Sequence, residues 1–308
     1  MKILITGNLG YIGSVLTAKL DRNKFEVFGF DTGYYKDCCF EKTENNFFQI
    51  FKDIREISKE DLINFDGIIH LASLSNDPLG NLNIGLTNEI NYKSTVRLAK
   101  LAKENGIKRF VYASSQSMYG ISTTQNELDE EDSEKNPITA YAKTKWNAEL
   151  YLKNMNDDNF IVSCFRPSTV FGYSPRLRCD IVFNNLVACA YARGKIEIFS
   201  DGSPWRPVVH VEDVCDAFIA GLIAPKEIIG GKSFNVGIEN GNFTVAELAM
   251  AAQNSVPGCK IFFTGEHTDP RSYKVSFKKI LNELKDYFKP KWNLEKGGFQ
   301  LVEYFKKI

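Results

Sequence analysis

An apolar run at the start of the chain leads directly into a turn that contains three glycines. Residues 2–6 read Lys-Ile-Leu-Ile-Thr, Gly7, Gly10 and Gly13 follow, and a helical pattern then runs to about Leu20. Glycines let the backbone turn tightly and approach a pyrophosphate, which then lies at the helix N-terminus. The GxxGxxG spacing matches the usual dinucleotide fingerprint only in part, and the same glycines suit an ordinary turn. Because the turn follows the first strand directly, we favour a nucleotide site.

Strands and helices alternate regularly through the first half of the chain. Helical patterns cover about 88–105 and 140–155, and after Arg166 the alternation loosens into loops and shorter helical patterns. Apolar strand patterns follow the first one at 25–30, 47–51, 67–72, 109–113 and 159–166. This order predicts an α/β fold with a parallel, doubly wound sheet.

The helical pattern after Pro137 carries a tyrosine and a lysine on one face. Tyr141 and Lys145 are four residues apart, so their side chains lie one above the other. A lysine ammonium nearby lowers the pKa of a phenol, which makes the pair suitable as a general base for a substrate hydroxyl. Taken alone, the same spacing is also typical of an ordinary surface helix.

Polar residues follow the carboxyl ends of several predicted strands, where ligands bind in open α/β sheets. Asp31 can accept hydrogen bonds from an adenosine ribose and repel a 2′-phosphate, which favours NAD over NADP; it also suits a cap of the next turn. Asp53 is placed to reach the adenine, and the loop from Ser73 to Leu86 and the segment 114–120 supply hydroxyls. His70 lies within an apolar run and is more typical of a hydrogen-bonded core histidine than of a catalyst.

Composition excludes several classes of function. The formal net charge is zero, so the chain has no basic surplus for a nucleic-acid backbone. No apolar run is long enough to span a membrane, and no signal-peptide pattern precedes the glycines, so we expect a cytoplasmic protein. The seven cysteines show no CxxC spacing and are expected to be reduced, buried thiols. The three histidines form no cluster, so no metal site is expected.

Taken in order, these residues resemble the extended short-chain dehydrogenase/reductase family, and within it the NAD-dependent nucleotide-sugar epimerases and dehydratases that are like UDP-glucose 4-epimerase. The resemblance covers essentially the whole chain. It rests on Gly7, Gly10, Gly13, Asp31, the Ser114–Gly120 segment, Tyr141 and Lys145, the segment 166–172, and Arg206 with His210–Asp213. It implies a Rossmann-type NAD-binding domain at 1–166, to which about 205–235 returns, and a smaller α/β domain at 167–308 that mainly binds the nucleotide sugar.

The resemblance also implies roles for individual residues. Tyr141 would take the proton of the sugar C4 hydroxyl, Ser115 would hydrogen-bond that oxygen, and Lys145 would hold the nicotinamide ribose and lower the pKa of Tyr141. The expected substrate contacts are Ser75, Ser115, Gln116, Arg176, Arg206 and Arg271. The expected cofactor contacts are Gly7, Gly10, Tyr11, Ile12, Gly13, Asp31, Asp53, Ile54, Leu71, Ala72, Ser73, Asn91, Tyr141, Lys145, Pro167 and Thr169.

Departures from the family pattern leave the reaction open. The 4,6-dehydratases place Asp-Glu directly after the catalytic Ser/Thr, whereas this chain has Gln116-Ser117, which cannot act as acid and base. A C4 epimerase is therefore expected. The segment 174–180 resembles enzymes that oxidise nucleotide-linked heptoses, so a C4 dehydrogenase or 4-ketoreductase is the alternative, and a non-catalytic NAD-binding protein is less favoured. Family members commonly form homodimers through a four-helix bundle, here expected from 88–105 and 140–155.

Overall fold

A seven-stranded parallel sheet forms the centre of the computed structural model, which describes residues 1–308 except 42–46, 123, 125, 266–271 and 308. Its strand order is β11-β7-β5-β4-β1-β2-β3, with every neighbouring pair parallel. This confirms the predicted α/β fold with a parallel, doubly wound sheet. The strands are β1 (Lys2–Thr6), β2 (Glu26–Asp31), β3 (Phe48–Phe51), β4 (Gly67–His70), β5 (Arg109–Ala113), β7 (Ile161–Pro167) and β11 (Lys232–Val236).

Alternate residues of each central strand enter two different cores. On β1, Ile3 and Ile5 join the core on one face of the sheet, and Leu4 joins the core on the other. On β5, Val111 and Phe110 divide in the same way. Strands buried on both faces read as continuous apolar runs, which is why the sequence locates them well.

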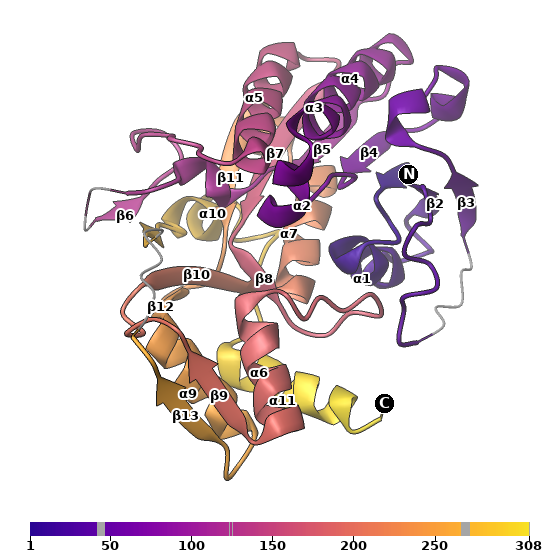
Figure 1. Ribbon diagram of the computed structural model, residues 1–308. Coiled ribbons are helices and arrows are strands. Elements are labelled where there is room, and N and C mark those ends of the chain that lie inside the picture. Colours follow the sequence, from indigo (N-terminus) through magenta and orange to yellow (C-terminus); the bar gives the residue numbers. More distant parts are fainter. Residues whose placement is uncertain (42–46, 123, 125, 266–271, 308) are drawn as a thin grey trace.

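Helices cover both faces of this sheet (Figure 1). One face carries α3 (Ile84–Asn88), α4 (Ser94–Glu104) and α5 (Ala140–Met155), and the other carries α1 (Tyr11–Lys19) and α7 (Val211–Ile223). The predicted helix at 88–105 is longer than expected, since α3 continues through a π-helical turn at Glu89–Lys93 into α4. Such turns displace side chains from the regular helical positions and are frequent at functional sites.

The rest of the chain forms smaller sheets and helices beside the large sheet, and the lower part of Figure 1 shows β9, β13, α6, α9 and α11. A three-stranded sheet has the order β12 (Asn242–Thr244), β10 (Trp205–His210) and β8 (Thr169–Phe171). Two parallel pairs join β9 (Lys195–Ile198) to β13 (Lys260–Phe263) and β6 (Glu127–Leu128) to β14 (Lys274–Val275). The helices are α2 (Asp77–Leu82), α6 (Val182–Arg193), α8 (Lys226–Ile229), α9 (Val245–Ser255), α10 (Lys278–Glu283) and α11 (Leu294–Phe305).

Two expectations about the chain as a whole can be compared with this structure. All seven cysteines are free, but only Cys164, Cys215 and Cys259 are buried, so the expectation that all are buried is wrong. Cys38 and Cys179 are exposed because they lie in loops rather than in strands or helices. Within the described residues, no helix combines the length and apolar character needed to cross a bilayer.

Candidate active site

The glycine turn between β1 and α1 leaves no room for side chains. Gly7 has a φ of 76°, and a Cβ on it would lie 2.7 Å from the backbone nitrogen of Ala72. A Cβ on Gly13 would lie 2.2 Å from the carbonyl oxygen of Gly7. Gly10 precedes the first residue of α1 and has an ordinary φ of −81°. The turn therefore presents bare backbone at a helix N-terminus, which fits a pyrophosphate and so fits NAD.

Alanine substitutions at Gly10 and Gly13 should have different effects on stability and on NAD binding. A Cβ on Gly13 collides with backbone atoms, so Gly13→Ala should lower the free energy of unfolding by about 1–3 kcal/mol. A Cβ on Gly10 has its nearest contact at 3.2 Å, so Gly10→Ala should retain the stability while weakening NAD binding, because its methyl group covers the cradle. Urea unfolding and NAD titration of both variants measure this. Equal stability losses would contradict the packing argument.

Asp31, the last residue of β2, is bonded to the glycine turn. Its carboxylate accepts hydrogen bonds from the backbone nitrogens of Gly33, at 2.8 Å, and Leu9, at 3.2 Å. Burial raises the pKa of Asp31, and these two hydrogen bonds offset part of that effect. The carboxylate is thus held at the end of β2, beside the glycine turn. Asp53 differs, because both of its oxygens are bonded to the Arg55 side chain, and it also caps the short helical turn that contains Ile54.

A chain of buried hydrogen bonds fixes the segment Leu71–Leu74, which follows β4. His70 contacts Thr6 through Nδ1 at 2.6 Å and Thr95 through Nε2 at 2.8 Å, and burial lowers its pKa to about 3. Asn91, in the π-helical turn, accepts from the backbone nitrogen of Leu74 at 2.8 Å and donates to its carbonyl oxygen at 3.1 Å. His70 is therefore a neutral core residue, and Asn91 supports the segment containing Leu71, Ala72 and Ser73.

Ser115, Tyr141 and Lys145 meet where β5 ends against α5. Ser115 hydrogen-bonds the Tyr141 side chain, and it also begins the short helical turn Gln116–Tyr119. The Lys145 ammonium lies 5.9 Å from the centre of the Tyr141 ring and donates to the carbonyl oxygen of Ala113 at 2.8 Å. Thr139 caps α5 and thereby fixes the first turn, on which Tyr141 lies. A hydroxyl, a phenol and an ammonium are thus placed together at the carboxyl edge of the sheet.

Burial is the largest influence on the pKa values of Tyr141 and Lys145. It raises the pKa of Tyr141, while the hydrogen bond from Ser115 and the charge of Arg178 act in the opposite direction. Burial also lowers the pKa of Lys145 to about 7. The sequence predicted that Lys145 would lower the pKa of Tyr141. In the structure the pKa of Tyr141 is raised instead, because desolvation of a phenolate in this site outweighs its stabilising contacts.

A buried ion pair lies beneath these residues. Glu149 is one helical turn beyond Lys145 on α5, and its carboxylate contacts the Arg166 guanidinium of β7. The carboxylate also accepts hydrogen bonds from Ser114 and Ser233, so it joins α5 to three strands of the sheet or their ends. The Nη1 atom of the Arg166 guanidinium donates to the Tyr119 hydroxyl at 3.0 Å. This network sets the position of α5, and therefore of Tyr141, relative to the sheet.

The two arginines of the segment 176–180 have different surroundings. The Arg176 guanidinium lies 4.5 Å from the centre of the Tyr35 ring and donates to the carbonyl oxygen of Leu177. Arg178 instead forms a two-pronged ion pair with Asp180 and reaches toward Ser75, at 3.5 Å. The sequence predicts a substrate contact for Arg176 and not for Arg178, and this stays a prediction. Two arginines two residues apart in a loop give no local signal to choose between them.

Other residues predicted for the site have structural partners. The Tyr11 hydroxyl donates to the carbonyl oxygen of Gly172 at 2.7 Å, so only its backbone is available to a cofactor. Gln116 is buried, and its Nε2 donates to the carbonyl oxygen of Arg166. His210 caps α7 and contacts Gln300. The remaining predicted residues are Ile12 in the first turn of α1, Pro167 and Thr169 at the junction of β7 and β8, Arg206 on β10, and Arg271, which lies outside the described residues.

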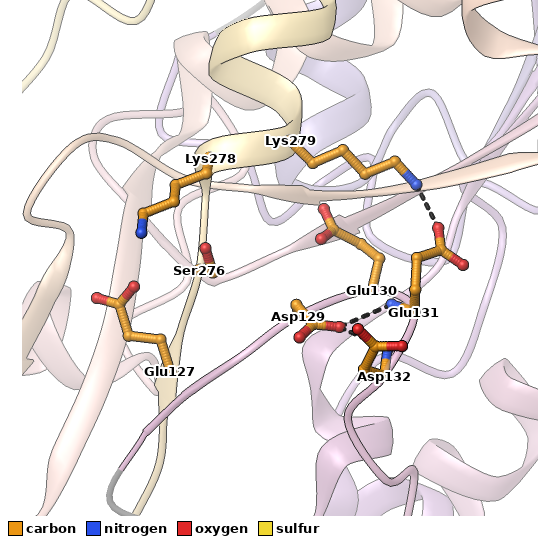
Figure 2. Close-up of a pocket in the computed structure, with 8 residues that line it drawn as sticks. All are labelled: Glu127, Asp129, Glu130, Glu131, Asp132, Ser276, Lys278 and Lys279. Carbon is orange, nitrogen blue, oxygen red and sulfur yellow. Dashed lines mark hydrogen bonds and ion pairs between the residues drawn. The ribbon is translucent and has the colours of Figure 1, made fainter.

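A separate acidic pocket of about 570 Å³ lies beside β6 and α10 (Figure 2). Its lining residues include none of those predicted for the site, and Lys279 pairs with Glu131 across it. The lining residues are Glu127, Asp129, Glu130, Glu131, Asp132, Ser276, Lys278 and Lys279. Within the described part of the chain, no group of three or more metal-ligating side chains is arranged to hold a metal ion.

Comparisons with known proteins agree with this fold. Residues 3–237 match the model of the NAD dependent epimerase/dehydratase family. A UDP-glucose 4-epimerase of Mycolicibacterium smegmatis is 32% identical over 255 residues, which cover 77% of each chain. UDP-glucuronic acid decarboxylase 4 of Arabidopsis thaliana is 28% identical over 321 residues, covering 100% of this chain and 69% of that protein.

Solved structures show the same fold. A UDP-glucose 4-epimerase of Thermotoga maritima, solved with UDP-glucose, superposes with a TM-score of 0.84 at 23% identity and covers 100% of this chain and 99% of its own. A UDP-glucuronic acid 4-epimerase of Bacillus cereus, solved with UDP-glucuronic acid and NAD, gives 0.82 at 23% identity with the same coverage. Given the extent of the family match and the identity to the mycobacterial enzyme, the chain belongs to the NAD dependent epimerase/dehydratase family.

Proposed function

We propose that the protein is an NAD-dependent nucleotide-sugar epimerase that oxidises the C4 hydroxyl of its sugar and restores it with inverted configuration. The observation that carries this proposal is the convergence of Ser115, Tyr141 and Lys145 at the end of β5, beside the glycine turn. A binding protein has no need of all three groups together. We also propose that residues 1–166 and about 205–235 hold the cofactor, that 167–308 mainly hold the nucleotide sugar, and that the enzyme works in the cytoplasm.

Tyr141 transfers the proton in the proposed reaction, and Ser115 and Lys145 position the substrate and the cofactor. The Tyr141 phenolate takes the proton of the C4 hydroxyl, and Ser115 donates a hydrogen bond to the same oxygen and orients it. Lys145, whose ammonium donates to the carbonyl oxygen of Ala113 at the end of β5, would hold ribose hydroxyls of the cofactor. NAD, when bound, supplies the hydride acceptor and donor at C4. On the return path Tyr141 gives its proton back to the oxygen of the ketone.

The surroundings of Gln116 disfavour net dehydration. Its amide is buried and donates to the carbonyl oxygen of Arg166, and an amide neither releases nor accepts a proton near neutral pH. Loss of water would need an acid and a base at neighbouring carbons. C4 oxidation is therefore the step that the remaining candidate reactions share.

The second candidate function is a net C4 dehydrogenase or 4-ketoreductase, for example on a nucleotide-linked heptose. The resemblance of the segment 174–180 to heptose-oxidising enzymes favours this second candidate.

A substrate panel distinguishes these reactions. Purified protein with NAD is incubated with UDP-, GDP-, CDP- and dTDP-sugars, including UDP-glucuronic acid and a GDP-heptose, while NADH absorbance and sugar mass are followed together. The epimerase gives a 4-epimer of unchanged mass and no net NADH. A dehydrogenase gives stoichiometric NADH and a sugar lighter by two hydrogens. A uronic acid oxidised at C4 is a β-keto acid, so loss of carbon dioxide from it would identify a decarboxylase instead. No turnover of any member would sink the proposal.

The proposed cofactor is NAD rather than NADP, and Asp31 tests this choice. Asp31→Asn should weaken NAD⁺ binding about 10-fold, because a charged hydrogen bond to the ribose is worth about 1.5 kcal/mol. The same change should reduce the ratio of the NADP⁺ to the NAD⁺ dissociation constant, since it removes the charge that repels the 2′-phosphate. Calorimetric titration with both nucleotides measures the ratio. Asp53→Asn is the matched control and should have a smaller effect, because Arg55 already occupies that carboxylate. An unchanged ratio in Asp31→Asn would contradict this role.

We also propose a homodimer formed through α4, α5 and the π-helical turn that precedes α4. Ile84 and Leu86 of α3, which runs into that turn, are exposed, as are Leu82 at the end of α2 and Leu150 on α5. Exposed apolar side chains grouped on neighbouring helices are typical of an interface. Sedimentation equilibrium of the wild type and of Ile84→Glu tests it. A monomeric wild type at micromolar concentration would be inconsistent with this interface.

A further inference from the structure

We propose that two loops, in contact with each other, form a gate that must open before NAD enters or leaves its site. One lies between β8 and α6 and is called here the cover loop, residues 172–180; the other follows β2 and is called the β2 loop, residues 33–41. The proposal rests on the proposed function, since it places NAD along the carboxyl edge of the large sheet with its pyrophosphate at the glycine turn. Separation of the two loops is then the step that limits exchange of NAD.

The first turn of α1 holds one end of the cover loop. The Tyr11 hydroxyl donates to the carbonyl oxygen of Gly172 at 2.7 Å. In the other direction, the Ser174 hydroxyl donates to the carbonyl oxygen of Tyr11 at 2.7 Å and lies 2.9 Å from the Ser14 hydroxyl. Tyr11 and Ser174 are buried, and Tyr11 is the first residue of α1. The cover loop is therefore fixed beside the helix N-terminus to which the pyrophosphate is assigned.

The next residues of the cover loop are bonded to the β2 loop. The backbone nitrogen of Phe40 donates to the carbonyl oxygen of Pro175 at 3.1 Å. The Tyr173 hydroxyl donates to the Glu41 carboxylate. These bonds join the cover loop to the segment that follows β2, whose last residue, Asp31, is proposed to bind the adenosine ribose.

Aromatic side chains extend the contact between the two loops. The Arg176 guanidinium of the cover loop lies 4.5 Å from the centre of the Tyr35 ring of the β2 loop. The Tyr304 ring of α11 packs against both loops: its centre lies 4.2 Å from that of the Tyr173 ring and 6.0 Å from that of the Phe40 ring. The loops thus meet along a surface of side chains and not at a single bond.

The far end of the cover loop reaches the loop after β4. Nη1 of Arg178 lies 3.5 Å from the Ser75 hydroxyl, and Asn184 of α6 donates to the Arg178 carbonyl oxygen at 3.0 Å. The cover loop therefore contacts the segments that follow β1, β2 and β4, which are adjacent in the sheet in the order β4-β1-β2. Dinucleotides bind at the carboxyl edge of such strands. A loop attached at three places along this edge crosses the outward path of a bound NAD.

The contacts of the β2 loop are the ones that open. Tyr35, Phe40 and Glu41 are exposed, whereas the residues that hold the cover loop to α1 are buried. Residues 33–41, all of which the structure describes, form no helix or strand. Hydrogen bonds between exposed groups are replaced at small cost by hydrogen bonds to water. Opening therefore moves the β2 loop away, while the cover loop keeps its place on α1.

Exchange of labelled NAD tests the gate without any sugar. Protein loaded with NAD is mixed with an excess of deuterated NAD, and the nucleotide released from denatured samples is weighed by mass spectrometry over time. Uptake by protein freed of nucleotide gives the association rate in the same way. Tyr173→Phe should raise both rates about 3- to 10-fold, because it removes one hydrogen bond of the closed gate in the free and the loaded protein alike. The dissociation constant of NAD should stay nearly unchanged.

Two further variants relate the effect to this hydrogen bond. Glu41→Ala should raise both rates as Tyr173→Phe does, and the double variant should exceed neither single variant, because both changes remove the same bond. Tyr191→Phe is the matched control. Tyr191 is an exposed tyrosine of α6 whose ring packs against Phe305, and its substitution should leave both rates unchanged.

Two results would overturn the proposal. If Tyr173→Phe raises only the dissociation rate, so that the dissociation constant rises in proportion, Tyr173 acts on NAD binding itself and not on a gate. If neither Tyr173→Phe nor Glu41→Ala changes the rates, separation of these loops does not limit exchange. Both results would leave the proposed function intact, because that function depends on turnover of the sugar panel, which the exchange of NAD does not measure.

Discussion

Tyr141→Phe is expected to lower turnover of the accepted nucleotide sugar by about 1,000-fold, the loss typical of removing a positioned general base. The substitution removes one oxygen and leaves the ring in place on α5, so folding and NAD content should be unchanged. The phenol is the group that Ser115 hydrogen-bonds and whose pKa the charge of Arg178 lowers. Steady-state rates with the substrate identified from the panel measure the loss.

A matched substitution on the same helix provides the control. Tyr151 lies on α5 with its ring 5.9 Å from the Lys100 ammonium, away from Ser115. Tyr151→Phe should therefore retain the wild-type rate. Wild-type turnover by Tyr141→Phe would show that the phenol is not the base and would favour a binding protein or a different catalytic group.

Glu149→Gln is expected to lower the free energy of unfolding by about 3–5 kcal/mol, because it leaves the Arg166 guanidinium buried without its counter-charge. Both side chains are almost fully excluded from solvent, and the carboxylate also accepts from Ser114 and Ser233. Denaturant unfolding at pH 7 measures the difference. The control is Glu303→Gln, which breaks an exposed pair with Lys306 and should leave the free energy of unfolding nearly unchanged.

The same pair should make stability depend on pH in a definite direction. Burial opposes ionisation of Glu149, but the charge of Arg166 and the hydrogen bonds of Arg166, Ser114 and Ser233 hold its pKa below the usual value. A carboxylate whose pKa is lower in the folded state contributes stability above its unfolded pKa of about 4.3, and that contribution is lost as pH falls further. The gap between wild type and Glu149→Gln should therefore be full at pH 7 and shrink below about pH 4. A gap of equal size at pH 3 and pH 7 would contradict the assignment.

The sequence predicted those parts of the protein that local patterns determine. The first six strands of the large sheet in chain order are apolar runs. Of these, β1, β4, β5 and β7 are almost wholly buried, whereas the edge strand β3 exposes Phe48 and Phe51. The glycine turn is required by backbone contacts within the first 13 residues and with Ala72. Tyr141 and Lys145 share a helix face because of helical geometry alone. The seventh strand, β11, was not located, since its place beside β7 depends on a crossover of the later chain.

The parts that the sequence did not predict depend on partners far along the chain. The different surroundings of Arg176 and Arg178 come from Tyr35 and Ser75, both more than 100 residues away. The Tyr11 hydroxyl donates to the carbonyl oxygen of Gly172, 161 residues along the chain. The protonation of Lys145 depends on burial against Tyr112, which no spacing reveals. Sequence patterns therefore identify the groups proposed for catalysis, but not how burial and neighbouring charges shift their pKa values.

Transfer of a label from C4 of the substrate tests the central claim most directly. A nucleotide sugar deuterated at C4, taken from the active members of the panel, is incubated with the enzyme and NAD, and the products are examined by mass spectrometry and NMR. The account predicts that the deuterium leaves C4 and returns to the same carbon in the 4-epimer, and that Tyr141→Phe abolishes this transfer. Product formation with the deuterium never leaving C4, or epimerisation at another carbon, would contradict it.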